Sequence, residues 1–258
     1  MTFKRSLLVV LLSVAAFGAT SPAEATHTWG SYHWARQSNP FTLRLADNVS
    51  SQWDASLQLA STDWTQSSVL DTTVVAGSGN PKTCKPVAGR VEVCNSKYGQ
   101  TGWLGIAQIW ASGSHITQGV VKLNDTYFNS PSYNSPAWRN FVTCQEVGHT
   151  FGLGHQDEEF GNANLGSCMD YTNDPTTNQH PNTHDFDLLE AIYSHTDSTT
   201  TVRSSSASAG AGNAQNDWGK AIGGHDASGD HHHDDVFVKN LGNGQVVVTH
   251  VFWAAHSH

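Results

Sequence analysis

Alternating and periodic apolar positions in the first half of the chain predict a strand, a helix and a second strand. Residues 41–45 alternate between apolar and polar side chains, as a half-buried strand does. Residues 53–64 carry apolar side chains at helical spacing, and residues 70–75 are rich in β-branched residues. Short β-like runs come next between residues 91 and 128, around 105–110 and 119–123, separated by Gly, Ser and Asn turn signals. This order indicates an α+β fold with a twisted, mixed sheet.

Two further helices and a hairpin are predicted in the second half. Pro136 suits the first turn of a helix that runs through Phe141 and Val147 towards Gly152, because proline fits where no amide proton is needed. Residues 184–195 also have an apolar helical face. Residues 236–239 and 245–252 flank a loop with two glycines, which is typical of a β-hairpin. We expect this hairpin to be an appendage to the main fold.

The N-terminus has the layout of a secretory signal peptide. Lys4 and Arg5 precede an apolar run over residues 7–17, and small residues end it at Ala23 to Ala25. We therefore expect residues 1–25 to be removed and the mature protein to be secreted, either extracellular or periplasmic. No later stretch approaches the roughly 20 consecutive apolar residues that span a bilayer, so we expect no membrane association.

Composition divides the mature chain into a domain, a linker and a tail. Residues 26–196 form one domain of ordinary size, residues 197–214 are a Ser, Thr, Ala and Gly-rich flexible linker, and residues 215–258 are a His-rich tail with the hairpin. The tail's His225 and 231–233 could capture metal, although a solvated loop is the favoured interpretation. The formal net charge of −9 argues against nucleic acid as a partner. We expect a monomer.

Four cysteines in an exported chain favour disulfide bonds over free thiols. Three pairings are possible in principle. Local pairing is the simplest: Cys84 with Cys94, and Cys144 with Cys168, the second pair tethering the helix that begins at Pro136 to the chain beyond it. A zinc–thiolate site is the weaker alternative, because no CxxC spacing occurs.

The chemistry concentrates in residues 145–155, which read QEVGHTFGLGH. Gln145 and His149 are one helical turn apart and point the same way, while Glu146 is rotated by about 100° and can address a water molecule beside a metal. His155 is too far along a straight helix to share that metal, since six residues rise by roughly 9 Å. The helix must therefore end between His149 and His155. Gly152 is placed where a left-handed residue would turn the chain back.

This run resembles the long zinc motif HExxHxxGxxH of the metzincin metallopeptidases, with glutamine in the first position. That family joins the motif to a later methionine turn, and residues 167–171 (SCMDY) supply one. Met169 is the only methionine besides the initiator. The resemblance covers residues 41–195, implies a short lower subdomain after the active-site helix, and leaves the tail unexplained.

The resemblance implies a role for each residue. Gln145, His149 and His155 would bind Zn²⁺, Glu146 would act as general base on the metal-bound water, and a peptide or protein would lie along the cleft as substrate. Met169 would lie beneath the metal without binding it. Tyr171 would approach the zinc or the transition state. The implied activity is that of a zinc metalloendopeptidase, a hydrolase.

Gln145 departs from the family's pattern, and three interpretations stay open. Gln145 binds the metal through its side-chain oxygen, or Tyr171 or a histidine from elsewhere completes the shell, or the site is degraded and inactive. The first is favoured, because Glu146, His149 and His155 all remain. The alternative function is a catalytically inactive, secreted metal-binding or adhesion protein that keeps the metzincin fold.

Overall fold

The computed structural model describes residues 27–202, 217–223 and 235–254. The signal peptide expected at residues 1–25 and the histidine run at 231–233 lie outside these ranges. Within them, nine strands form one sheet with the order β3-β2-β4-β6-β5-β9-β8-β7, and β1 pairs with β6 off this path. The strands are β1 (His33–Trp34), β2 (Phe41–Asn48), β3 (Leu70–Ala76), β4 (Val91–Ser96), β5 (Trp103–Ser112), β6 (His115–Asn124), β7 (Lys220–Gly223), β8 (Val236–Gly242) and β9 (Gln245–Trp253).

The sheet is mixed, as the sequence predicts. β3, β2, β4 and β6 run parallel to one another, whereas β5 lies antiparallel between β6 and β9. β5 and β6 are longer than the predicted runs 105–110 and 119–123. Gly105 and Gly119 lie inside these strands because neighbouring side chains come very close to their backbones: a Cβ on Gly119 would lie 2.9 Å from Val91.

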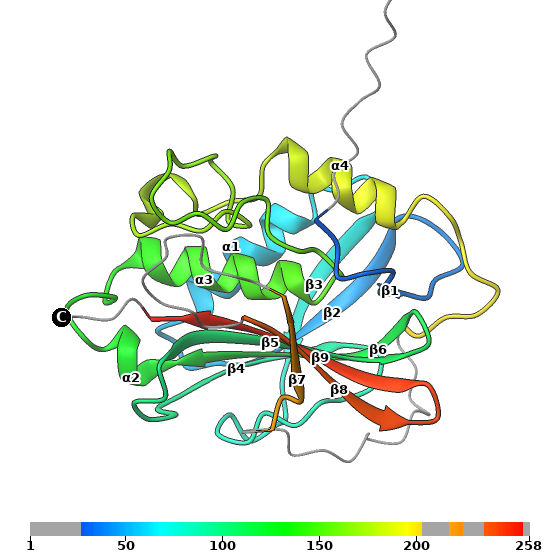
Figure 1. Cartoon of the computed structure of the whole chain (residues 1–258), viewed down its shortest axis with the longest axis horizontal. Coiled ribbons are helices and arrows are strands. Elements are labelled where there is room, and N and C mark those ends of the chain that lie inside the picture. The colour runs from blue at the N-terminus through cyan, green and yellow to red at the C-terminus, as the bar shows by residue number, and fades with distance from the viewer. Residues whose placement is uncertain (1–26, 203–216, 224–234, 255–258) are drawn as a thin grey trace, which may run out of the picture.

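The helices are α1 (Asp54–Trp64), α2 (Asp125–Phe128), α3 (Pro136–His149) and α4 (Thr183–Ile192), with a short 3-10 helix, η1 (Pro175–Thr177). In Figure 1, α1, α3 and α4 lie on one side of the sheet, and α2 lies at the end of β6. α1 and α3 pack against each other, and α3 contacts β5. Among the described residues, no helix is long and apolar enough to cross a membrane.

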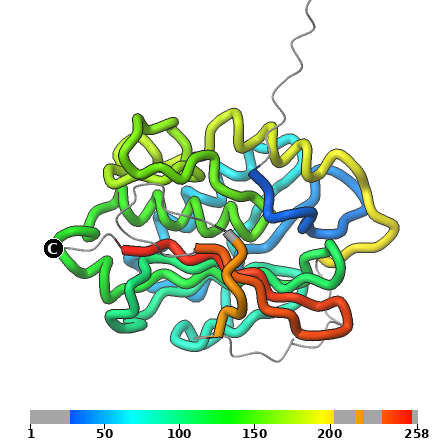
Figure 2. The backbone as a smooth tube through the Cα atoms, in the orientation of Figure 1, coloured from blue at the N-terminus to red at the C-terminus, as the bar shows by residue number. Residues whose placement is uncertain are grey.

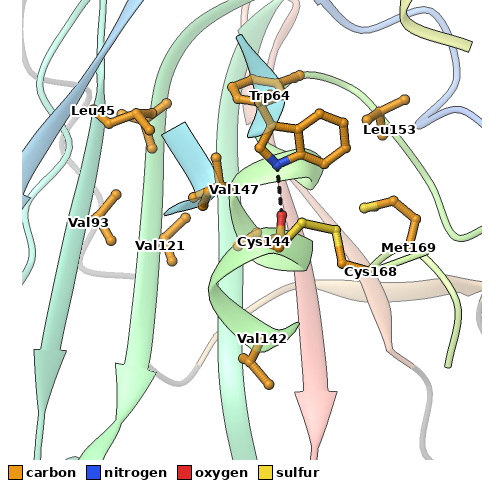
Figure 3. Close-up of a cluster of buried hydrophobic side chains, with 14 of the residues drawn as sticks. Leu45, Trp64, Val93, Val121, Val142, Cys144, Val147, Leu153, Cys168 and Met169 are labelled. Atoms are coloured by element: carbon orange, nitrogen blue, oxygen red, sulfur yellow. Dashed lines mark hydrogen bonds between the residues drawn. A yellow bond between two sulfur atoms is a disulfide. The ribbon is translucent and has the colours of Figure 1, made fainter. Parts of the chain in front are cut away.

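The core between sheet and helices is apolar, and it includes one disulfide (Figure 3). Leu45, Val93 and Val121 from three strands meet Val147 of α3, and all four are fully buried. The indole of Trp64, at the end of α1, donates a hydrogen bond of 3.1 Å to the backbone carbonyl of Cys144 in α3. This bond and the apolar packing together fix α3 against α1 and above the sheet.

Both predicted disulfides are present. Cys84 bonds Cys94, and Cys144 bonds Cys168. The second bridge joins α3 to the residue before Met169, so it ties the predicted methionine turn to the helix that carries the motif (Figure 3).

α3 begins and ends as predicted. Ser135 is the N-cap and its hydroxyl accepts from the backbone N–H of Trp138, with Pro136 in the first turn. The helix ends at His149, and Gly152 lies beyond it with φ +98°. A Cβ at Gly152 would lie 2.3 Å from the carbonyl oxygen of Tyr32, so both the backbone angle and the space require glycine there.

The C-terminal hairpin forms as predicted, but it lies in the main sheet and is not an appendage beside it. β9 pairs with β5 from Trp103↔Trp253 to Ser112↔Gln245, and Figure 2 shows the red C-terminal strands beside the green ones. β5 would otherwise be the open edge of the sheet, and an apolar edge strand gains by being covered. The tail therefore contributes to the same core as residues 27–202.

The start of the predicted linker 197–214 is packed against the N-terminal strand region. The backbone N–H of Asp197 donates to the carbonyl of Arg36, that of Thr201 donates to the carbonyl of Ala35, and Val202 is buried. These hydrogen bonds give order to a stretch with few apolar side chains. Residues 203–216 lie outside the described part of the chain.

Candidate metal centre

Three buried histidines converge at the end of α3. His149 is the last residue of the helix, His155 lies in the segment after Gly152, and His250 is on β9. One ring nitrogen from each lies within 4.8 Å of the other two. The break at Gly152 thus returns His155 to His149, as the sequence predicts. His250 comes from a strand far along the chain, and the sequence did not identify it.

The hydrogen bonds of His149 and His155 leave one nitrogen free on each ring. Nδ1 of His149 lies 2.8 Å from the carbonyl oxygen of Leu153, which can only accept, so Nδ1 carries the proton and Nε2 a lone pair. Nδ1 of His155 lies 3.3 Å from a carboxylate oxygen of Glu158, with the same consequence. Both Nε2 atoms are buried without a hydrogen-bond partner among the described residues.

Gln145 and Glu146 add three more buried atoms without a partner. Both amide atoms of Gln145 and Oε1 of Glu146 lack a hydrogen bond within the described ranges, while Oε2 of Glu146 lies 3.2 Å from Nδ1 of His250. Unpaired polar atoms in a protein interior are costly unless a ligand satisfies them. Imidazole nitrogens, an amide oxygen and a carboxylate together are donors that suit Zn²⁺, so the residues present fit the implied metal.

Burial shifts the pKa values of the three histidines and of Glu146. It lowers the pKa of His149 well below its usual value, and neighbouring His250 and His155 lower it further. Burial also lowers the pKa of His155, and it lowers that of His250 to about 3. It raises the pKa of Glu146 well above its ordinary value, although His155 opposes that shift. The imidazoles are therefore neutral, which is the form that binds a metal.

The position of Glu146 depends on a glycine in the neighbouring strand. A Cβ added to Gly105 of β5 would lie 2.6 Å from Oε1 of Glu146 and 2.7 Å from Val142. Only a residue without a side chain lets α3 approach β5 this closely. Gly105 therefore fixes where the carboxylate lies.

Met169 lies under the helix that carries the motif. It is fully buried, and its Sδ would lie 2.8 Å from a Cβ on Gly148, so the sulfur packs directly against the α3 backbone. The disulfide at the preceding residue, Cys168, holds it there. Met169 is thus fixed against the helix that carries His149, and its place beneath a metal stays a prediction.

Tyr171 lies beside the histidines, with its hydroxyl already engaged. Its ring centroid is 4.2 Å from that of His155. The hydroxyl donates to the carboxylate of Asp235 and lies 3.1 Å from Nε2 of His250. Burial and the Asp235 carboxylate raise the pKa of Tyr171 well above its ordinary value, so the hydroxyl keeps its proton. Asp235 is a second neighbour of the site that the sequence did not identify.

The N-terminal segment packs over the motif and forms one wall of a pocket. The indole of Trp29 stacks on the ring of His149, with centroids 5.0 Å apart and planes 5° from parallel. A pocket of about 410 Å³ lies between this segment and β8, and His155 and Glu158 reach its lining. The remaining lining residues are mostly apolar and include Trp29, Tyr32, Ile222, Val236, Val238 and Val248.

No protein-family model and no curated protein sequence matches the chain. Among solved structures, myroilysin is 11% identical with a TM-score of 0.38, over 65% of this chain and 98% of its own. High choriolytic enzyme 1, a hatching enzyme zinc-protease from Oryzias latipes (medaka fish), is 11% identical with a TM-score of 0.36, over 64% of this chain and 95% of its own. Superpositions this loose carry no argument about activity, so the function rests on the site itself.

Proposed function

We propose that the chain is a secreted zinc-dependent endopeptidase in which His149, His155 and His250 hold the metal and Glu146 is the general base. The observation that carries this proposal is the convergence of three buried imidazoles next to a buried carboxylate. Three protein ligands leave the fourth position of a tetrahedral zinc open, as catalytic sites require. Two disulfides fit export to an oxidising compartment.

His250 takes the part that the motif's first histidine plays in the resembled family. This is the second of the interpretations that the sequence leaves open, a histidine from elsewhere. Gln145 lies one helical turn before His149, with an amide that no described residue satisfies, but a neutral amide oxygen is a weaker zinc donor than an imidazole. We therefore assign the third ligand to His250 and not to Gln145.

The chain's own residues supply the proton transfer and the positioning. When bound, zinc would polarise the scissile carbonyl and acidify a water molecule. Oε1 of Glu146 has no partner among the described residues and is free to take a proton from that water, while Oε2 holds Nδ1 of His250. Tyr171 acts as a positioning residue, because its hydroxyl donates its proton to Asp235 and so leaves the lone pair on Nε2 of His250, 3.1 Å away, available to a metal.

The apolar pocket beside His155 suits a side chain of a peptide substrate. Its walls carry few charges apart from Glu158, and Ile222 at its margin is exposed. A hydrophobic residue next to the scissile bond would bury apolar surface there. We propose unstructured proteins or peptides with such residues as the substrate class.

Cleavage of an unstructured protein and zinc content together test the proposal. Glu146→Gln should lower the cleavage rate by about 100-fold or more, since it removes the base, and should keep its zinc. His250→Ala should lose both activity and zinc, and Gln145→Ala should keep its zinc. A chelator should abolish cleavage by the wild type, and added zinc should restore it.

Glu190→Gln is the matched control, because Glu190 is an exposed glutamate on α4 outside the site. It should cleave at the rate of the wild type. If Glu146→Gln also did so, Glu146 would not be the general base and the proposal would fall.

A closed, non-catalytic zinc site is the second candidate. It is favoured by the pairing of β9 along β5 and by the contact of His250 with Glu146, which together place the tail against the proposed base. This candidate predicts bound zinc with no chelator-sensitive cleavage by the wild type. Bound zinc together with a gain of cleavage in His250→Ala would instead identify the tail as an inhibitor of the enzyme.

A further inference from the structure

A second group of metal-binding side chains lies away from the motif and takes no part in the centre at the end of α3. His33 of β1, His195 after α4 and Asp197 each offer one ligand atom within 4.8 Å of the other two. His115, the first residue of β6, adds its Nε2 at 3.2 Å from Oδ1 of Asp197. His33, His195 and Asp197 are the His33 cluster, and His115 is its neighbour.

The spacing in the His33 cluster matches a tetrahedral zinc. Bonds of about 2.0 to 2.1 Å in tetrahedral arrangement separate neighbouring donors by roughly 3.3 Å. Nε2 of His33 lies 3.2 Å from Nε2 of His195 and 3.5 Å from Oδ1 of Asp197. Nε2 of His195 lies 3.7 Å from the same oxygen. All three distances are within a few tenths of an ångström of the expected value.

The surrounding hydrogen bonds direct lone pairs into the cluster. Nδ1 of His33 lies 2.8 Å from the carbonyl oxygen of Ser31, so it carries the proton and Nε2 carries a lone pair. Oδ2 of Asp197 is held by Arg36, through the guanidinium at 2.9 Å and the backbone N–H at 3.1 Å. Oδ1 is left facing the imidazoles. Such partners behind each ligand are typical of metal sites.

Without a cation, one contact of the cluster joins two acceptors. Nε2 of His33 carries a lone pair, so it can accept from Nε2 of a neutral His195 at 3.2 Å. It cannot donate to Oδ1 of Asp197, which lies 3.5 Å away. One divalent ion would accept lone pairs from all three groups at once.

We propose that His33, His195 and Asp197 bind a second zinc ion, which holds the chain after α4 to β1. The ligands come from two separate segments, β1 and the chain that follows α4. In Figure 1 that last segment runs down the side of the molecule from α4 towards β6. A metal at this point would fasten it to the sheet.

Access does not prevent metal from reaching the His33 cluster. The side chain of His195 is 50% exposed and that of His115 is 36% exposed, whereas those of His33 and Asp197 are 8% and 10% exposed. The two inner ligands, His33 and Asp197, are therefore fixed, and His195 can close over an ion that arrives from solvent.

Metal content of the full-length protein tests the proposal. After loading with zinc and dialysis, His195→Ala should hold one equivalent of zinc fewer than the wild type, measured by elemental analysis. His149→Ala should also lose one equivalent, and the double variant should lose two. Any zinc on the histidine run at 231–233 is common to all these proteins and cancels in the comparison.

His180→Ala is the matched control, because His180 pairs with one carboxylate, Asp63 at 2.7 Å, and belongs to no group of three ligands within the described residues. It should hold as much zinc as the wild type. Equal zinc in His195→Ala and the wild type would overturn the second site. A loss in His195→Ala with none in His149→Ala would instead overturn the proposed function and leave the second site standing.

Thermal unfolding separates metal binding from a purely hydrogen-bonded role. Zinc that binds only the folded chain raises its melting temperature. The zinc-dependent rise, measured for each protein against the same protein with chelator, should be smaller in His195→Ala and in Asp197→Asn than in the wild type. Asp197→Asn also weakens the ion pair with Arg36, so only the zinc-dependent rise is compared. Equal zinc-dependent rises in all three would overturn the proposal.

Discussion

Two glycines decide where the side chains of the candidate metal centre lie, because each lets a neighbouring segment of the chain approach closely. Gly152 permits the turn that returns His155 to His149, and Gly105 permits Glu146 to lie against β5. At both positions a Cβ atom would overlap a neighbouring atom. Replacing a glycine with alanine therefore tests whether this close approach matters.

Gly105→Ala should lower cleavage by about 10-fold or more while the protein stays folded and keeps its zinc. The added Cβ would lie 2.6 Å from Oε1 of Glu146, and a displacement of about 1 Å is enough to cost that much in a catalytic group. Gly161→Ala is the control, since a Cβ there meets nothing within 4 Å. Cleavage at the wild-type rate by Gly105→Ala would show that Glu146 tolerates the shift.

Among the secondary-structure elements, α4 is connected through its N-cap residue to the segment that contains His155. Asn182 accepts from the backbone N–H groups of His184 and Asp185, and the Asp185 carboxylate accepts in return from the backbone N–H of Asn182. The amide of Asn182 also donates to Gln156, the residue after His155. One side chain thus starts the helix and supports the loop beside the metal centre.

Asn182→Ala should lower the free energy of unfolding by about 1 to 2 kcal/mol, because the cap is lost. Asn182→Asp keeps a capping oxygen but cannot donate to Gln156, so it should recover most of that stability. Urea unfolding at saturating zinc measures both. If the alanine and aspartate variants were equally destabilised, the cap would not be the cause.

For the molecule as a whole, the central part of the sheet buries a lysine side chain. Lys122 of β6 lies between β4 and β5 and is 5% exposed. Burial lowers its pKa from the ordinary value of 10.5 to about 8. Between these two values the unfolded chain binds more protons than the folded one, so stability should rise with pH there.

Stability of the wild type relative to Lys122→Met should therefore increase from about pH 8 to about pH 9.5, by at most about 1.4 kcal/mol per pH unit. Below about pH 8 the difference should level off, because both states then hold the proton. Urea unfolding in steps of pH measures it, and Lys97→Met, at an exposed lysine, should show no such trend. A flat difference across this range would mean that Lys122 is solvated in the folded protein.

Features that depend on neighbours along the chain could be predicted from the sequence alone. The helix from Pro136, its end before Gly152, the return of His155 and both disulfides are consequences of local spacing, cap residues and turn chemistry. The apolar run at 245–252 likewise predicted a strand. Each of these needs only a few consecutive residues to be recognised.

The place of that last strand in the sheet, and the residue it brings to the site, needed the folded structure. His250 reaches Glu146 across 104 positions because β9 pairs with β5, and no period or motif in the tail specifies which edge it covers. The His33 cluster likewise joins residue 33 to residues 195 and 197, which no spacing relates. Edge pairing depends on which strand is left uncovered once the core has formed, and that is a property of the assembled sheet.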